Sequence, residues 1–302
     1  MPEPVSKIKA HVKAAWEMTT VAFRQWWNDD AFRLASSLAF YTVFSLAPIL
    51  LVSVGLASLI FNQEEAKHQV IQQIGMMTGN QGEIVARQVL NNLDEIGGSV
   101  RAIIVGIAAL LLGSTAVFVN LQSALNTIWK VQPAPDAGMI KGFIRDRLRS
   151  FGIVLSVGFL LLVSMVFSAL VSGIEQIASQ QFEALSWIWQ FSSFAISFVM
   201  ATLLFAMVYK YLPDVKIRWR DVLVGAMITA GFFSIGKSLI GMYLGRRAIG
   251  SAYGAAGSFV VLLIWIYYSA LICFLGAEFT QVYARNYGKR IQPEDHAVRT
   301  ED

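Results

Sequence analysis

Six long runs of apolar residues divide the chain, and each is long enough to cross a lipid bilayer. A transmembrane helix needs about 20 mostly apolar residues, because each residue rises 1.5 Å and the hydrocarbon layer is roughly 30 Å thick. Four of the runs contain no charged residue, the fifth contains Lys237, and the sixth carries Glu278 near its end. The pattern predicts six transmembrane spans, at residues 34–61, 102–129, 150–174, 184–209, 222–245 and 248–284.

These spans are expected to be α-helices, since backbone polar groups that face lipid must be paired within their own segment. The alternating pattern of a transmembrane β-barrel is absent. Composition agrees: 56% of the 302 residues are hydrophobic and 15% are charged, whereas soluble domains have about 45–50% and about 25%. The predicted fold class is all-α, a polytopic integral membrane protein with six transmembrane helices in a domain at residues 34–284.

Three regions outside the spans have distinct patterns. Residues 1–33 repeat apolar and aromatic positions at spacings of three and four, which predicts an amphipathic N-terminal helix on the inner membrane surface. Residues 62–100 show the same periodicity and predict an external loop of two short helices, separated near Gly79 and Gly82. Residues 285–302 are predicted to form a polar cytoplasmic tail.

Lys and Arg are distributed unevenly between the two sets of connections. The N-terminal segment, the second and fourth loops and the tail hold 18 of the 24, the opposite connections hold five, and Lys237 lies within a span. Cytoplasmic loops carry the excess of positive charge in membrane proteins. Both termini are therefore predicted to be cytoplasmic, with the 62–100 loop outside.

Two ionisable residues, Lys237 and Glu278, lie clearly inside predicted spans. Each costs up to about 3 kcal/mol at mid-membrane on insertion scales, so each is a candidate for lining a polar path. The alternative is structural: Lys237 extends toward the outer surface, and Glu278 lies just inside the inner boundary near Arg285. Their depths differ by about 15 Å at 1.5 Å per residue, which is too far for a direct ion pair unless the helices tilt strongly.

Polar residues at helical spacing line the first span before Pro48, whose missing N–H is expected to kink the helix. This stripe faces either a partner helix, through interhelical hydrogen bonds, or a water-filled cavity. Asn120, Gln122 and Asn126 of the second span are candidates to complete it. The stripe consists of Ser37, Tyr41 and Ser45, and Arg33 before it is a further candidate for the same polar path.

The fifth span is rich in glycine, which lets neighbouring helices approach closely and offers a face for a homodimer. Residues 231–238 also match the phosphate-loop pattern G-x-x-x-x-G-K-S. That motif requires a strand-to-helix loop open to nucleotide, so inside an apolar span the match is a coincidence. The helix-packing positions are Gly225, Gly231, Gly236, Gly241 and Gly245.

Catalytic chemistry has little support in the sequence. Cys273 is the single cysteine, which excludes a disulfide framework and a cysteine-rich metal site. His11, His68 and His296 are too scattered to form a local metal cluster or to activate a nearby serine. We expect no enzyme activity, no cofactor and no metal. The basic loops are explained by the orientation of the protein in the membrane and by contact with anionic lipids, so we expect no nucleic-acid partner.

Two motifs resemble the YihY/BrkB family of bacterial inner-membrane proteins. The first is Ala-Ser-Ser-Leu-Ala-Phe-Tyr-Thr-Val-Phe-Ser-Leu-Ala-Pro at 35–48; the second runs from Tyr253 to Ala270 and continues into Gly-Ala-Glu-Phe-Thr at 276–280. The likeness covers roughly residues 15–290 and implies six helices in the inner membrane with both ends inside. The family is linked to virulence and serum resistance, and loosely to lipid or lipopolysaccharide export. It has also carried a ribonuclease label, which the missing metal ligands make a poor fit.

The predicted function is transport: a flippase-like protein for an amphipathic envelope component, a lipid or a lipopolysaccharide-related molecule. Polar groups in otherwise apolar helices motivate this hypothesis. Without a usable nucleotide motif, an ion gradient or the gradient of the substrate itself drives the movement. The alternative is a scaffold protein of the envelope that transports nothing, and a membrane-bound ribonuclease is the weakest hypothesis. Membrane lipids are the expected partners.

Overall fold

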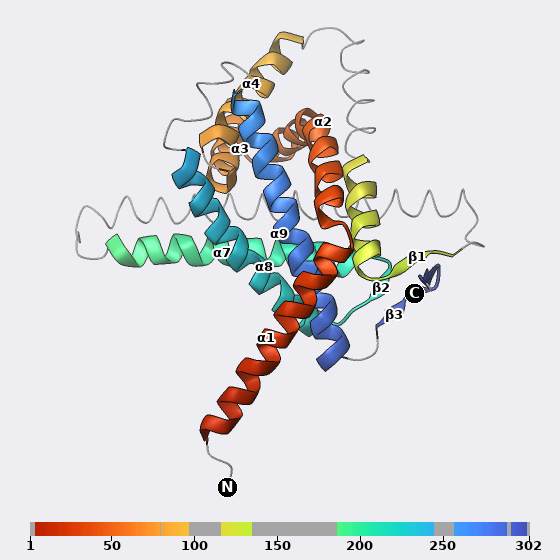
Figure 1. The fold of residues 1–302 in the computed structure, drawn as a ribbon. Helices are drawn as coiled ribbons and strands as arrows, with labels where there is room; N and C mark the ends of the chain where they lie inside the picture. The colour runs from red at the N-terminus through yellow and green to blue at the C-terminus, as the bar shows by residue number, and fades with distance from the viewer. Residues whose placement is uncertain are drawn as a thin grey trace.

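The computed structural model describes residues 4–78, 80–96, 116–134, 186–244, 257–288 and 291–300, and most of these are helical (Figure 1). A further helix at residues 116–128 precedes β1. The elements are α1 (Pro4–Asn28), α2 (Ala31–Ala57), α3 (Gln63–Thr78), α4 (Asn80–Ile96), β1 (Val131–Pro133), α7 (Ser186–Tyr211), β2 (Val215–Lys216), α8 (Trp219–Leu244), α9 (Gly257–Tyr287), β3 (Gln292–Pro293) and β4 (Ala297–Arg299).

Two helices within the described residues have windows long and apolar enough to cross a membrane, Phe194–Tyr211 in α7 and Leu262–Tyr287 in α9. They overlap the fourth and sixth predicted spans. Helices α2 and α8 overlap the first and fifth, and α2 continues through Pro48. The third span and part of the second lie outside the described residues, so the count of six spans stays a prediction.

Short polar signals set the ends of several helices. The Asn62 side chain accepts a hydrogen bond from the backbone N–H of Glu65 at 3.0 Å and so caps the start of α3. Asp30 adopts a left-handed conformation, with φ of 53°, in the turn between α1 and α2. Aspartate tolerates this conformation better than most residues. Helices α3 and α4 occupy the region of the predicted external helical loop, and they lie far from α1 in Figure 1.

Helix α9 is the central element, since it packs against α1, α2, α4 and α8. Its contact with α8 is reciprocal. Gly225 of α8 lies against Thr280, and Gly276 of α9 lies against Thr229. Each threonine hydroxyl donates to the carbonyl four residues earlier in its own helix, so neither hydroxyl is left unpaired at this close approach.

Tyr209 ties α7 to the same contact. Its side chain is fully buried, and its hydroxyl donates to the carbonyl of Cys273 at 2.7 Å and lies 3.0 Å from the Thr229 hydroxyl. One phenol thus joins α7, α8 and α9. On the other side of α9, the Trp26 indole N–H donates to the Leu271 carbonyl at 3.1 Å and holds α1 in place.

Two antiparallel strand pairs gather connections that are far apart in the sequence. β1, which follows the 116–128 helix, pairs with β4 with Val131 opposite Arg299. β2, which follows α7, pairs with β3 with Val215 opposite Pro293. The C-terminal region predicted as a polar tail therefore contains two short strands, and it lies beside the second and fourth loops.

Asp214 joins these connections through a buried hydrogen-bond network. Its carboxylate accepts from the Asn126 amide at 2.9 Å and the Gln122 amide at 3.3 Å, and it lies 3.0 Å from His296 Nε2. Its own backbone N–H donates to the Asn126 side chain. Its backbone carbonyl accepts from Glu294. Gln122 and Asn126 were predicted to complete a water-filled cavity, and in the structure they bind Asp214 instead. We call this hydrogen-bond network, which joins the helices to the C-terminal strands, the Asp214 lock.

The first prediction concerns the α8–α9 contact. In Gly276→Ala, the added Cβ would lie 1.8 Å from the Thr229 hydroxyl oxygen and 2.7 Å from the Tyr209 hydroxyl. Such overpacking costs about 1–3 kcal/mol, so we expect a lower Tm of the purified protein in detergent. The matched control is Gly231→Ala on α8, where nothing lies within 4 Å, and its Tm is expected to be unchanged or slightly higher. Equal Tm values for the two variants would contradict this packing.

The second prediction concerns the Asp214 lock. Asp214→Ala removes the acceptor of two buried amide groups, a loss of about 1–3 kcal/mol, and is expected to release the C-terminal strands to protease. The readout is the rate at which a C-terminal tag is removed by limited proteolysis. Asp295→Ala is the control, since that side chain is 92% exposed and its ion pair with Lys216 contributes little. Equally slow removal in both variants would show that Asp214 does not hold the tail.

Candidate functional site

Glu278 is the most deeply buried ionisable side chain of α9. The residue is 1% exposed, and neither carboxylate oxygen has a hydrogen-bond donor among the described residues. A buried ionisable group without a hydrogen-bond partner is costly, which makes Glu278 a candidate for a functional role. Glu278 is a candidate from the sequence, and the structure places it where α1 meets α9.

The group beside Glu278 is another carboxyl, that of Asp29 in the turn after α1. Asp29, Lys130 and Arg285 all interact with Glu278 electrostatically, Asp29 as a like-charged neighbour and the two cations as opposite charges. Two carboxyl groups form a hydrogen bond only when one of them carries a proton. The arrangement is therefore suited to holding one proton between two acidic side chains.

Lys130 completes the site from a third element. It follows the 116–128 helix, and its ammonium group forms a short ion pair with the Asp29 carboxylate. The side chain of Lys130 is 39% exposed, and that of Asp29 is 9% exposed. Exposure thus falls in the order Lys130, Asp29 and Glu278.

Backbone strain is concentrated at the same place. Asp30 and Lys130 are the non-glycine residues with positive φ in the described part of the chain, at 53° and 54°. One adjoins Asp29 and the other is its ion-pair partner. A left-handed residue costs roughly 1–2 kcal/mol, and such strain is typically kept at functional sites.

Further buried polar atoms without partners lie on the same segments. The residues concerned belong to the end of α1 and the turn after it, to the position before Lys130, and to α9 between Glu278 and the next turn. They are Gln25, Asp29, Trp129, Glu278 and Gln281. We refer to these residues and Lys130 as the carboxyl cluster.

The predicted polar stripe of the first span divides between different environments. Arg33 is exposed and lies 3.6 Å from Asp30, so it faces solvent. Ser37 donates to the Asn120 side chain at 2.8 Å and links α2 to the 116–128 helix. Tyr41 is half-buried, and Ser45 is buried and donates to the carbonyl of Thr42. The stripe therefore contains one interhelical bond, and it does not form a continuous polar surface.

Lys237 lies on α8, and its side chain is outside the described set. Its neighbour Gly236 packs against Tyr268 of α9. Tyr268 and Glu278 are separated by about 15 Å at 1.5 Å per residue. The two ionisable residues of the predicted spans are thus at different levels of the bundle.

The helix-packing glycines also differ from one another. Gly225 and Gly236 lie in close contact with α9, whereas Gly231 faces open space. The surroundings of Gly241 are not described, and Gly245 lies outside the described residues. The side chain of Pro48 is outside them as well.

Asp29 and Lys130 are members of the site that the sequence pattern does not single out, because Lys130 counts there as a loop charge and Asp29 has no assigned role. The available signal was the acidic pair 29–30 directly before the first span and a lysine directly after the second. Among the described residues, no group of three or more His, Cys, Asp or Glu is placed to hold a metal ion.

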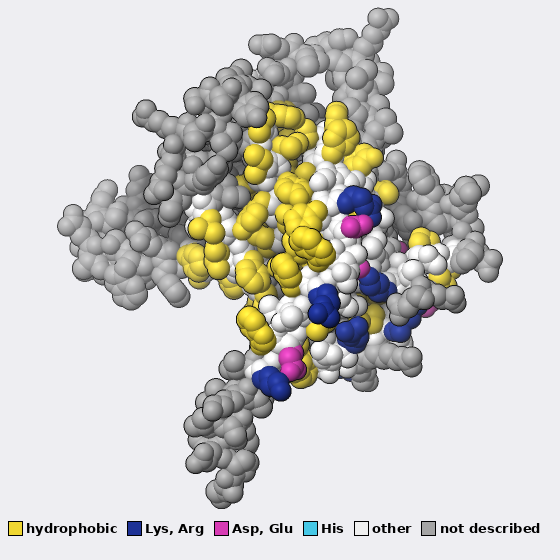
Figure 2. All heavy atoms as spheres, viewed as in Figure 1, with side chains coloured by type: hydrophobic (Ala, Val, Ile, Leu, Met, Phe, Trp, Pro, Cys, Tyr) yellow, Lys and Arg dark blue, Asp and Glu magenta, His cyan; other side chains and the backbone are white. Residues whose placement is uncertain are grey.

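The exterior of the bundle is apolar. Figure 2 shows hydrophobic side chains over the middle of the face in view, with Lys and Arg gathered toward one end. Large hydrophobic residues are exposed on α2, α7, α8 and α9, a distribution that suits contact with lipid. They include Phe40, Phe44, Phe194, Val199, Phe232, Ile235, Leu239 and Ile264.

Comparisons with known proteins agree with this exterior. A UPF0761 membrane protein of Albidiferax ferrireducens is 30% identical over 267 residues, which are 87% of this chain and 61% of the relative. Another of Delftia acidovorans is 28% identical over 272 residues, 88% of this chain and 62% of the relative. This chain thus spans about three-fifths of the length of these relatives. No solved structure matches it.

The family model described as Virulence factor BrkB matches residues 22–301, which confirms the resemblance of the two motifs in the first and sixth spans. Both relatives are named as membrane proteins, and neither name describes an enzyme. With its apolar helices, its lipid-compatible exterior and this match over most of its length, the chain belongs to the BrkB virulence-factor family of membrane proteins.

Proposed function

We propose that this protein is an inner-membrane transporter, flippase-like in action, that moves an amphipathic envelope lipid or lipopolysaccharide-related molecule and exchanges protons at the carboxyl cluster. The observation that carries the proposal is the pair formed by Glu278 and Asp29. An ionisable group buried inside a membrane bundle is by default a candidate for a substrate path or a proton relay.

The exposure gradient from Lys130 to Glu278 supports proton access from one side. Lys130 and Asp29 belong to the side where α1, the strand pairs and the C-terminal residues gather. Protonation of Glu278 removes its negative charge and its repulsion with Asp29, whereas loss of the proton strengthens its attraction to Lys130 and Arg285. A change in protonation therefore alters the forces between α1 and α9, the two helices that carry the pair.

An amphipathic substrate suits the remaining features. The exposed apolar faces of α2, α7 and α8 offer lipid contact, and the Ser37–Asn120 bond adds polar groups between two helices. Lys237 and Tyr41 are proposed as further members of the path. No described feature favours a scaffold role over transport, and a transport assay discriminates between the two.

The proposed orientation has both termini in the cytoplasm. The strand pairs join the start of the second loop and the fourth loop to the C-terminal residues. In the sequence, these three segments carry 13 of the 24 Lys and Arg. The Asp29–Lys130 ion pair adds the end of α1 to the same side. Such a grouping is what the positive-inside rule requires of cytoplasmic segments.

The transport prediction compares the wild type with Glu278→Gln in proteoliposomes under an imposed pH gradient. Glutamine keeps the shape of the side chain but does not ionise, so we expect translocation of a fluorescent phospholipid to fall to the rate of protein-free vesicles. Asp29→Asn is expected to have the same effect. The readout is quenching of outer-leaflet fluorophore by an impermeant reductant over time.

Glu83→Gln is the matched control, because Glu83 forms an ion pair on the surface of α4 and is not part of the carboxyl cluster. It is expected to retain the wild-type rate. If wild type, Glu278→Gln and protein-free vesicles all give the same rate, the protein does not move this lipid and the scaffold role replaces transport. If Glu278→Gln is as active as wild type, Glu278 has no part in the coupling.

The orientation prediction uses single added cysteines in cells with the outer membrane made permeable. Glu64→Cys at the start of α3 is expected to react with a membrane-impermeant maleimide, and Glu17→Cys on α1 is expected to react only after the inner membrane is disrupted. Both glutamates are exposed, while the native Cys273 is buried and gives a low background. Labelling of Glu17→Cys in intact spheroplasts would reverse the orientation.

A further inference from the structure

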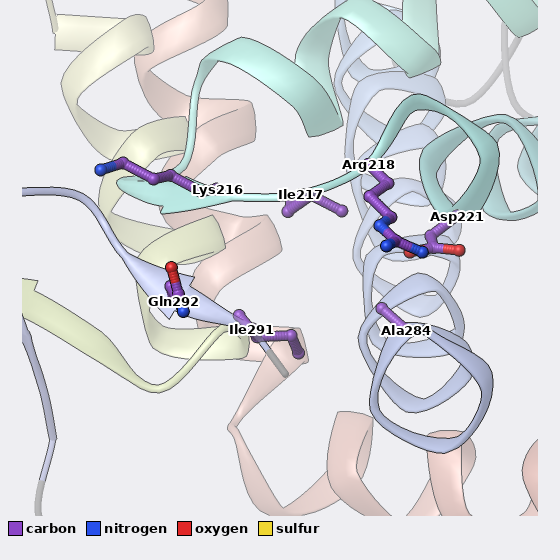
Figure 3. A pocket seen from close by; sticks show the side chains of 7 residues that line it. All are labelled: Lys216, Ile217, Arg218, Asp221, Ala284, Ile291 and Gln292. Atoms are coloured by element: carbon purple, nitrogen blue, oxygen red, sulfur yellow. The ribbon is translucent and has the colours of Figure 1, made fainter. Parts of the chain in front are cut away.

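A second polar site lies where the start of α8 meets the end of α9, and it shares no residue with the carboxyl cluster. The pocket has a volume of about 340 Å³, within the roughly 300–1,000 Å³ of small-molecule sites. Lys216, Ile217, Arg218 and Asp221 line one side, and the opposite side is formed by Ala284 and the β3 segment (Figure 3). Three separate stretches of the chain therefore build it.

Asp221 supplies a fixed negative charge to this pocket. The residue is 8% exposed and lies in the first turn of α8. Among the described residues, no hydrogen bond or ion pair joins its carboxylate to another group. Gly288 packs against it so closely that a Cβ there would lie 2.8 Å from Asp221 Oδ2. Gly288, directly after α9, thus lies against the carboxylate, and Asp221 also lines the pocket (Figure 3).

Two cations share the pocket with Asp221. The Lys216 ammonium is 2.6 Å from the exposed Asp295 carboxylate. That hydrogen bond raises the pKa of Lys216 and lowers the pKa of Asp295, so both stay charged and neutralise each other. The Arg218 guanidinium has no ion-pair partner in the described part of the chain. It also lies just before α8, whose N-terminus favours anions.

A carboxylate and a guanidinium that do not pair with each other in one pocket indicate a ligand with two opposite charges. A simple anion would be repelled by Asp221, and a simple cation would be repelled by Arg218. Guanidinium groups bind phosphate through two parallel hydrogen bonds, and a buried carboxylate is satisfied by a primary ammonium group. A phosphate linked to a primary amine by a short chain meets both requirements.

Aromatic residues place the pocket at the level of lipid headgroups. Tyr211 and Trp219 flank the β2 loop, are partly exposed, and contact each other with ring centroids 5.8 Å apart. Tyr283 and Tyr287 form a second pair, at 5.4 Å, at the end of α9 beside Ala284. Tyrosine and tryptophan are enriched where transmembrane helices leave the hydrocarbon.

We infer that this pocket binds the phosphoethanolamine headgroup of a zwitterionic phospholipid, with the phosphate on Arg218 and the ammonium on Asp221. The apolar side chains of Ile217 and Ile291 then lie beside the glycerol end of the headgroup. Binding of the headgroup does not require transport, so a negative transport assay would leave this inference unaffected.

The experiment measures binding of three phospholipids with identical acyl chains to the delipidated full-length protein in detergent, by native mass spectrometry. Phosphatidylethanolamine is expected to bind roughly tenfold more tightly than phosphatidylglycerol, which lacks the amine, a ratio that one charge-assisted hydrogen bond supplies. It is also expected to bind more tightly than phosphatidylcholine, whose methylated amine has no N–H donor. Equal affinities, or a preference for phosphatidylglycerol, would overturn the inference.

Two variants assign the contacts. Asp221→Asn is expected to weaken phosphatidylethanolamine binding and to strengthen phosphatidylglycerol binding, so that the preference is lost. Arg218→Gln is expected to weaken both. Arg220→Gln is the matched control, because this arginine lies in the same turn but does not line the pocket, and it should keep the wild-type preference. An unchanged preference in Asp221→Asn with a wild-type Tm would overturn the assignment of the ammonium site.

A competition arm identifies the source of the headgroup. Glycerophosphoethanolamine, which has the same polar group and no acyl chains, is added at increasing concentration to protein loaded with phosphatidylethanolamine. Retention of the lipid supports an intact phospholipid as the ligand. Full displacement at low concentration overturns the lipid assignment and leaves a soluble phosphoamine as the ligand of the same two residues.

Discussion

The close approach of α8 and α9 is the contact on which the rest of the bundle depends. Gly225 and Gly276 each receive a threonine from the opposite helix, and the two threonine hydroxyls are satisfied within their own helices. In lipid, helices gain little from burying apolar surface, so packing of this kind determines which helices associate. The contact positions Tyr209, which joins α7, and it leaves the opposite side of α9 free to meet α1.

Because α9 is surrounded by other helices, its polar residues are withdrawn from lipid. Glu278 faces the end of α1, and Arg285 lies two turns further along the same helix. The pocket lined by Asp221 lies at the last turns of α9, and the Asp214 lock holds the strands that follow it. The carboxyl cluster, the pocket at Asp221 and the Asp214 lock thus lie at one end of the bundle. Polar atoms there can be buried among protein groups and still lie close to water.

Hydropathy is a good guide to some of this arrangement and a poor guide to the rest. Glu278 stands out in any sequence window because a lone acid in an apolar run is rare. Asp29 and Lys130 do not stand out, since charged residues are ordinary at the ends of spans. Strands β3 and β4 have two and three residues, and β3 contains a proline, so no local pattern predicts them. They form because β1 and β2 present edges to the C-terminal residues.

Membrane residence, helical content and the unusual acid of the last span follow from the linear order of residues, because the cost of placing a charge or an open backbone in hydrocarbon depends on composition within a window of about 20 residues. The pairing of Asp29 with Glu278 and Lys130, the Asp214 lock and the pocket at Asp221 arise only when the chain is folded. Their members are separated by tens to hundreds of residues. Contacts at that separation depend on helix packing, which the small residues of α8 and α9 direct.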